Sequence, residues 1–233
     1  MGGAFLHILN HSLFKALLFY AAGADYQQPH TCNLEALGGL IKRMLQTALL
    51  FMAGAIAISA LHLLNGFISE FLMYSGMYQT LHLTGLSVDI LLLFTFSGLA
   101  IIGGLVIFAF TKVFTMAFLG SPPRSNAIYL ADETALSMRV PNFIILLLML
   151  LLGFLPMAAF RIISPVTALF TGEIDLLMHR TASLTSVSLS SLIFLLLLGV
   201  LWLLRNWQQR GHSATQSASW GCGYTGGDPA CHQ

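Results

Sequence analysis

The chain has 233 residues, of which 57% are hydrophobic and only 8% are charged. A soluble domain carries about 25% charged residues, so the composition excludes an ordinary soluble protein and indicates an integral membrane protein. The net charge of +1 and the lack of a basic cluster exclude nucleic acid as a partner. The three cysteines are too few for a disulfide framework in a chain of this length, and their spacing gives no CxxC metal motif; they are Cys32, Cys222 and Cys231.

The first predicted membrane span, residues 4–24, carries three ionisable side chains. His7, His11 and Lys15 are four residues apart, so they lie on one helix face as a ladder about 12 Å long. Ionisable groups at membrane depth are costly and usually mark a proton or ion path. Two structural alternatives remain open, namely a buried histidine with a backbone partner and a Lys15 that reaches the membrane interface.

The second and third predicted spans are separated by a break signal. Residues 44–61 contain no charge and are rich in small residues, which suit close helix packing in lipid. Asn65 and Gly66 then interrupt the apolar pattern, and Glu70 follows before the apolar run resumes. We therefore expect a helix broken near Asn65–Glu70, with irregular backbone that is covered by protein or water, as along a transport path. The alternative is a Glu70 at the interface after a surface turn.

The fourth predicted span, residues 88–119, is longer than the roughly 30 Å hydrocarbon core requires, so it must tilt or protrude. Lys112 lies near its end. This lysine fits a pathway role and a snorkelling role equally well.

Two further spans complete the predicted fold. Residues 141–163 form the fifth, which we expect Pro156 to kink, and residues 183–205 form the sixth. The fold class is thus an all-α integral membrane protein with about six transmembrane helices. Its membrane domain covers residues 1–207, and a polar, Gly-rich tail covers 208–233. Lysine and arginine are divided evenly between the two sets of loops, so charge does not orient the bundle.

The buried ionisable groups suit proton transfer rather than cofactor chemistry. No nucleotide-binding, nucleophile or CxxC motif accompanies them, and we expect no cofactor. His7 and His11 are spaced like a metal-ligand pair, but the glutamate of HExxH is absent and Lys15 on the same face would repel a cation, so we expect no metal. Histidine exchanges protons near neutral pH, and coupled titration with a lysine and a carboxylate is a basis for pumping.

Three segments resemble the antiporter-like membrane subunits of the complex I superfamily. They are HILNHSLFKALLFYAAGA (7–24), LEALGGLIKRM (34–44) and ISALHLLNGFISEFLMY (58–74). That superfamily includes the proton-pumping subunits of NADH:quinone oxidoreductase, membrane-bound hydrogenases and Mrp-type antiporters. Two later segments, FTKVFTMAFLGSPPRS (110–125) and SWGCGYTG (219–226), are most similar to the branch of hydrogenase-4 component B and the related formate hydrogenlyase subunit.

The resemblance implies that this chain is the C-terminal part of a larger helix bundle, without the earlier spans. By position it makes His7, His11 and Lys15 relay residues, makes Glu70 the ionisable residue on the broken helix, and matches Lys112 to a lysine of the hydrogenase-like branch. It also implies a multi-pass protein of the plasma membrane with residues 25–43 outside and the tail in the cytoplasm.

The chain departs from the family at one place. The family usually reads Leu-Pro-Pro before Asn-Gly, whereas this chain has Leu61-His62-Leu63. His62 is then either an additional proton site or a neutral change.

The sequence thus favours a proton-translocating membrane subunit of a multi-subunit redox complex, with His7, His11, Lys15, Glu70 and Lys112 as its proton-relay residues. The chain has no catalytic centre of its own, so whether it is counted as an enzyme depends on the complex. We expect other membrane subunits and a peripheral redox arm with iron–sulfur or nickel–iron subunits as partners, besides the lipid bilayer. The alternatives are an Mrp-type cation/proton antiporter subunit without a redox partner and a non-translocating scaffold fragment.

Overall fold

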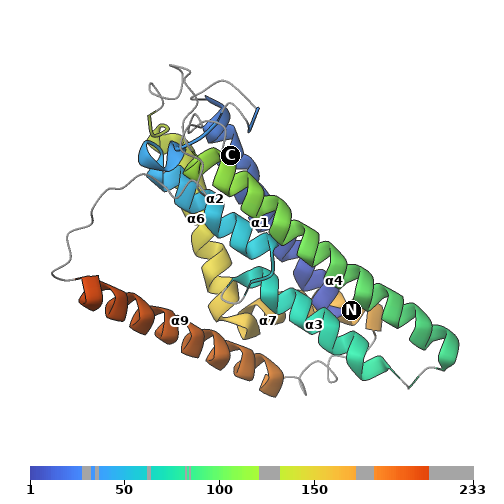
Figure 1. The fold of residues 1–233 in the computed structure, drawn as a ribbon. Helices are drawn as coiled ribbons and strands as arrows, with labels where there is room; N and C mark the ends of the chain where they lie inside the picture. The colour runs from blue at the N-terminus through green and yellow to red at the C-terminus, as the bar shows by residue number, and fades with distance from the viewer. Residues whose placement is uncertain are drawn as a thin grey trace, which may run out of the picture.

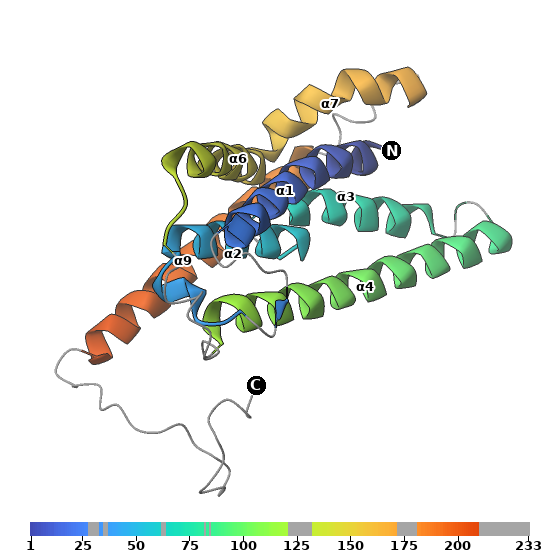
Figure 2. The ribbon, with the colours of Figure 1, turned by 90° about the horizontal axis from the view of Figure 1, so that it is seen from above.

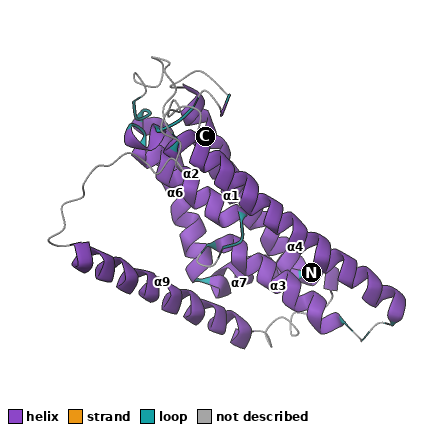
Figure 3. Cartoon of the chain, in the orientation of Figure 1, coloured by secondary structure: helices purple, strands orange, loops and turns teal. Residues whose placement is uncertain are grey.

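The protein is all-helical in the part of the chain that the structure describes. That structure is a computed structural model, and it describes residues 1–27, 33–34, 37–61, 64–81, 83, 85–120, 132–171 and 181–209. Its long helices are α1 (Gly2–Gln27), α2 (Leu45–Ile58), α3 (Asn65–Thr80), α4 (Leu86–Phe114), α6 (Leu136–Phe154), α7 (Pro156–Thr171) and α9 (Thr181–Gln209). Two short elements, the 3₁₀ helix η2 (Leu40–Lys42) and the π-helical turn η3 (Thr115–Leu119), complete it. No strand occurs within these ranges, which confirms the predicted fold class (Figure 3).

Helix α1 is the centre of the bundle. It packs against α2, α3, α6 and α7, and Figures 1 and 2 show it between α6 and α7 on one side and α3 on the other. Its buried residues recur every three or four positions, which makes one continuous stripe. Gly54 of α2 permits a close approach, because a Cβ there would lie 2.9 Å from Cγ of Leu18.

The predicted helix break exists, but it lies before Asn65 rather than near Glu70. Helix α2 ends at Ile58, Ala60 adopts a left-handed φ of 49°, and α3 begins at Asn65. Gly66 therefore begins a helix, and it must be glycine because a Cβ would collide with the carbonyl oxygen of Ala57. The expectation of irregular backbone near Glu70 was wrong, since Glu70 lies in the regular second turn of α3.

The predicted fifth span is two helices. Helix α6 ends at Phe154, and Pro156 starts α7 instead of kinking one continuous helix. Proline suits a first helical position because its missing N–H has no intrahelical partner there. The predicted end of the fifth span at residue 163 was also wrong, since α7 continues to Thr171. At the far end, α9 runs through Gln209, two residues past the predicted end of the membrane domain at residue 207.

Three described helices are long and apolar enough to cross a membrane. They are Leu86–Leu119, Leu136–Phe154 and Leu189–Gln209, while the apolar helices Leu45–Ile58 and Pro156–Phe170 are shorter. The 26-residue α1 is about 39 Å long, which also suffices for crossing. The count of six spans stays a prediction. Helix α4 buries none of its side chains and lies on the side away from α6 and α7, so its apolar surface is open to lipid or further protein (Figure 2).

Candidate functional site

A hydrogen bond joins the histidine ladder to the helix that carries Glu70. The Nδ1 atom of His7 lies 3.1 Å from Oγ of Ser69, and that hydroxyl donates to the carbonyl of Gly66 at 2.9 Å. A hydroxyl has one proton to donate, so His7 Nδ1–H is the donor to Ser69. This contact fixes the tautomer of His7 and leaves its Nε2 as the basic nitrogen. Ser69 is the residue immediately before Glu70.

The two histidine rings are neighbours, as their helical spacing predicts. Their centroids are 6.0 Å apart, and the ring of Phe14 makes edge-on contacts with both, at 6.2 Å from His7 and 5.2 Å from His11. His7 is half-buried and His11 is exposed at the bundle surface. Rings at this separation exchange a proton through a bridging water rather than directly. Phe14 thus limits the rotation of both imidazole rings and reduces the space between them that a bridging water could occupy.

The remaining predicted site residues divide into two groups. Lys15 is half-buried one turn beyond His11, and Glu70 is half-buried on α3 one residue from the contact of His7. Lys112 is not brought to this site. It is exposed near the end of α4, in the region where Phe110 and Phe118 pack against Phe51 of α2. The structure therefore brings His7 and His11 together and joins His7 to Ser69, the residue before Glu70, and the role of His7, His11, Lys15 and Glu70 as a proton relay stays a prediction.

A reciprocal asparagine pair supports this contact, and sequence reasoning missed it. The Nδ2 atom of Asn10 donates to the backbone carbonyl of Asn65 at 2.7 Å, and Nδ2 of Asn65 donates to Oδ1 of Asn10 at 3.1 Å. Both side chains are fully buried, at 1% and 0% exposed. The available signal was the position of Asn10 on the otherwise apolar stripe of α1. The pair locks the first turn of α3 onto α1, one turn from the bond between His7 and Ser69.

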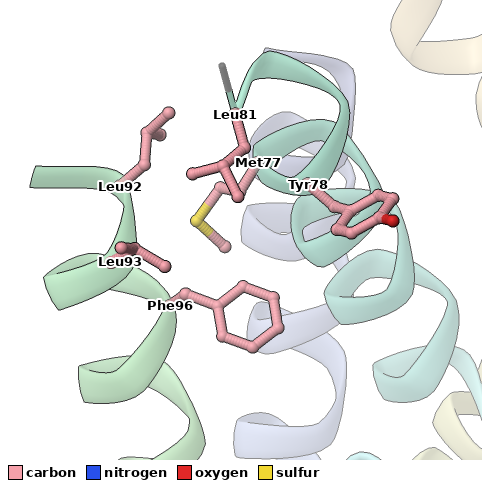
Figure 4. Close-up of a pocket in the computed structure, with 6 residues that line it drawn as sticks. All are labelled: Met77, Tyr78, Leu81, Leu92, Leu93 and Phe96. Carbon is pink, nitrogen blue, oxygen red and sulfur yellow. The ribbon is translucent and has the colours of Figure 1, made fainter. Parts of the chain in front are cut away.

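The described residues include no group that could hold a metal, and a small apolar cavity lies between α3 and α4. No group of three or more His, Cys, Asp or Glu side chains in these ranges could hold a metal ion. The cavity has a volume of about 110 Å³ and is lined by Met77, Tyr78 and Leu81 of α3 and by Leu92, Leu93 and Phe96 of α4. In Figure 4 the hydroxyl of Tyr78 points away from it. Its lining suits an acyl chain rather than a reacting group. The residues His62, Cys32, Cys222 and Cys231 lie outside the described ranges.

Comparisons with known proteins confirm the resemblance. Residues 1–99, which include His7, His11, Lys15 and Glu70, match the family model described as "NADH:quinone oxidoreductase/Mrp antiporter, TM". The chain is 37% identical over 149 residues to hydrogenase-4 component B of Escherichia coli (strain K12), which covers 64% of this chain and 21% of that protein. It is 34% identical over 125 residues to formate hydrogenlyase subunit 3 of the same organism, which covers 54% of this chain and 21% of that protein.

The similarity also extends to the quinone oxidoreductases. The chain is 39% identical over 77 residues to NAD(P)H-quinone oxidoreductase chain 4 1 of Synechococcus sp. (strain JA-3-3Ab), which covers 33% of this chain and 15% of that protein. The chain thus spans about a fifth or less of the length of the curated relatives it matches.

Proposed function

We propose that this chain is part of a proton-translocating membrane subunit of a multi-subunit redox complex, because residues 1–99 match the NADH:quinone oxidoreductase/Mrp antiporter family model. The observation that carries the proposal is the hydrogen bond between His7 and Ser69. It connects a ladder of titratable groups on α1 to the turn of α3 that holds Glu70. Two elements that bear ionisable groups inside an apolar bundle are thereby joined by a group that can pass a proton.

The geometry suggests the following sequence of proton movements. A proton that arrives on Nε2 of His7 makes the ring cationic. The ring can then give its Nδ1 proton to Oγ of Ser69, provided that this hydroxyl turns from the Gly66 carbonyl and gives its own proton to a water or to Glu70. In the other direction, a water between the rings passes a proton between His7 and His11. Lys15 is one turn further along the same face of α1 and extends the ladder beyond His11.

The partners follow from the relatives and from the exposed apolar helices. The relatives are named as components of hydrogenase-4, formate hydrogenlyase and NAD(P)H-quinone oxidoreductase. We assign the redox centres, iron–sulfur and nickel–iron, to a peripheral arm of partner subunits, and we assign the open faces of α4 and α9 to lipid and to neighbouring membrane subunits. The protein is a multi-pass membrane protein, and we place it in the plasma membrane with its tail in the cytoplasm.

The test is Glu70→Gln in the assembled complex, reconstituted in vesicles, with protons translocated per electron as the readout. Gln79→Glu is the matched control, because it changes a charge at an exposed position of the same helix. We expect Glu70→Gln to lower the ratio and the control to leave it unchanged. An unchanged ratio in Glu70→Gln, in a complex that still transfers electrons, would refute the proposal.

The family model also covers Mrp antiporters, so a second reading is a cation/proton antiporter subunit. Purification of the native complex in mild detergent, followed by mass spectrometry and analysis for nickel and iron, separates the two. Nickel and iron–sulfur partners support the hydrogenase-type complex. Co-purification with membrane antiporter subunits alone, together with sodium-dependent transport that needs no electron donor, supports the antiporter.

A further inference from the structure

A second acidic site lies at the other end of α1, where the N-terminus of α2 is capped by a distant carboxylate. Glu133, in the segment before α6, accepts hydrogen bonds from the backbone N–H of Gln46 at 2.8 Å and of Thr47 at 3.3 Å. The hydroxyl of Thr47 donates to the same carboxylate at 2.6 Å. These three donors hold the carboxylate of Glu133, and so its charge, in a fixed position at the N-terminus of α2.

Asp25 is the neighbour that this fixed charge acts upon. It lies in the last turn of α1, one residue beyond the predicted span 4–24, and is only 8% exposed. Among the residues that the structure describes, its Oδ1 atom has no hydrogen-bond partner. Burial, together with the charge of Glu133, raises the pKa of Asp25 to about 7. The negative end of the α1 dipole acts in the same direction.

The other charged groups on the elements around Asp25 do not neutralise it. Helix α2 has no ionisable side chain, and α6 has only Arg139, whose Nη1 donates to Oε1 of Gln46 at 2.7 Å. The packing of α3 and α7 on α1 is at the opposite end, around Leu6, so Glu70 and Arg161 are remote. The charged side chains of the nearby η2, α4 and pre-α6 segments are exposed; they are Lys42, Arg43, Lys112 and Asp132.

A second orphaned polar group is found beside the capping carboxylate. The hydroxyl of Thr134, the residue after Glu133, is buried at 2% exposed and has no hydrogen-bond partner within the described ranges. Buried polar atoms are almost always satisfied, so unpaired ones point to a bound proton or water at this place. One such atom is thus on the residue next to Glu133, and the other is on Asp25, which the charge of Glu133 reaches.

We propose that Asp25 is a proton-binding site at the loop end of α1, and that the like charge of the fixed Glu133 carboxylate favours its protonated form. Asp25 follows His7 by 18 positions, which is five full helical turns, so both lie on the same face of α1 about 27 Å apart. Binding of a proton by Asp25 follows from its burial and from Glu133 alone. A second role, in which Asp25 exchanges protons between the relay and the aqueous side and so acts as a port, rests in addition on the proposed function.

The test of proton binding is infrared difference spectroscopy on the full protein in lipid nanodiscs, with ¹³C-labelled aspartate, as a function of pH. We expect the band of a protonated aspartate to persist to near neutral pH, far above the roughly pH 4 of an exposed aspartate. Asp25→Asn should abolish the band, Glu133→Gln should move its loss to lower pH, and Asp132→Asn, a matched change at the exposed neighbour, should leave it unchanged. Absence of such a band above about pH 5, or its persistence in Asp25→Asn, would overturn the proposal.

The role as a port has its own readout. In the complex reconstituted in vesicles, Asp25→Asn should lower the number of protons translocated per electron. An unchanged ratio would overturn the port while leaving the proton site intact. The two proposals fail separately, because a failure of Glu70→Gln to affect the ratio leaves the infrared titration of Asp25 untouched.

Discussion

The two glycines of α3 provide a sharp test of the break between α2 and α3. Both lie in regular helix, where alanine is favoured over glycine by about 0.5–1 kcal/mol. At Gly76 nothing lies within 4 Å of an added Cβ, so Gly76→Ala should stabilise the protein by that amount. At Gly66 the added Cβ would collide with the backbone carbonyl of Ala57, which cannot rotate away as a side chain can. We expect a cost at the upper end of overpacking, about 3 kcal/mol, which leaves Gly66→Ala destabilised by about 2 kcal/mol.

The measurement is unfolding of the purified membrane protein as a denaturing detergent replaces a mild one, followed by circular dichroism. The two variants should move the midpoint in opposite directions, with a difference of about 3 kcal/mol between them. Gly66→Ala should also separate Ser69 from His7, because α3 must shift away from α2 to accept the methyl group. Equal stability of the two variants would show that the first turn of α3 does not abut the end of α2.

Two other predictions concern polar groups of α1. Ser69→Ala removes the acceptor of His7, so the imidazole should populate both tautomers in ¹⁵N NMR spectra. Proton translocation should slow about fivefold, which corresponds to the loss of a hydrogen bond of about 1 kcal/mol. A single, unchanged tautomer of His7 in the variant would contradict this prediction. In the folded protein Asp25 keeps its proton to about pH 7, whereas in the unfolded chain it releases the proton near pH 4. Between these pH values the folded state binds more protons than the unfolded state. The free energy of unfolding of the wild-type protein should therefore fall as pH rises from about 4 to about 7. Asp25→Asn should remove this fall, and an equal pH dependence in both proteins would refute the assignment.

The local part of the site was predictable from the sequence, because helical spacing determines which residues of one helix share a face. His7 and His11 are neighbours for that reason alone. The position of the helix break was not predictable from the sequence, because Asn and Gly in succession locally indicate the end of a helix. Two tertiary contacts make them a helix start instead: the side chain of Asn65 is bound by Asn10, and Gly66 fits against Ala57. Local signals do not contain either contact.

The same reasoning explains the other differences. Pro156 is compatible with a kink and with a first helical position, and only the packing of α7 beside α1 decides between them. Asp25 and Glu133 are more than a hundred positions apart, so no periodicity relates them, and each alone looks like a charge at the end of a span. Lys112 and Glu70 were predicted to act together, but the structure places them apart. The end of α4 that carries Lys112 packs near Phe51 of α2, which residue spacing within α4 could not show.

The polar contacts between α1 and α3 give a physical reason for a broken helix in an apolar bundle. A continuous helix through residues 45–80 would satisfy its backbone internally and would present side chains alone to α1. The break lets α3 start beside the middle of α1, so that the carbonyl of Asn65 and the hydroxyl of Ser69 accept hydrogen bonds from Asn10 and His7. Each bond contributes about 1 kcal/mol, which partly offsets the lost helical turns. The irregular segment therefore positions Ser69 against His7, which makes it part of the candidate site rather than only a connection between two spans.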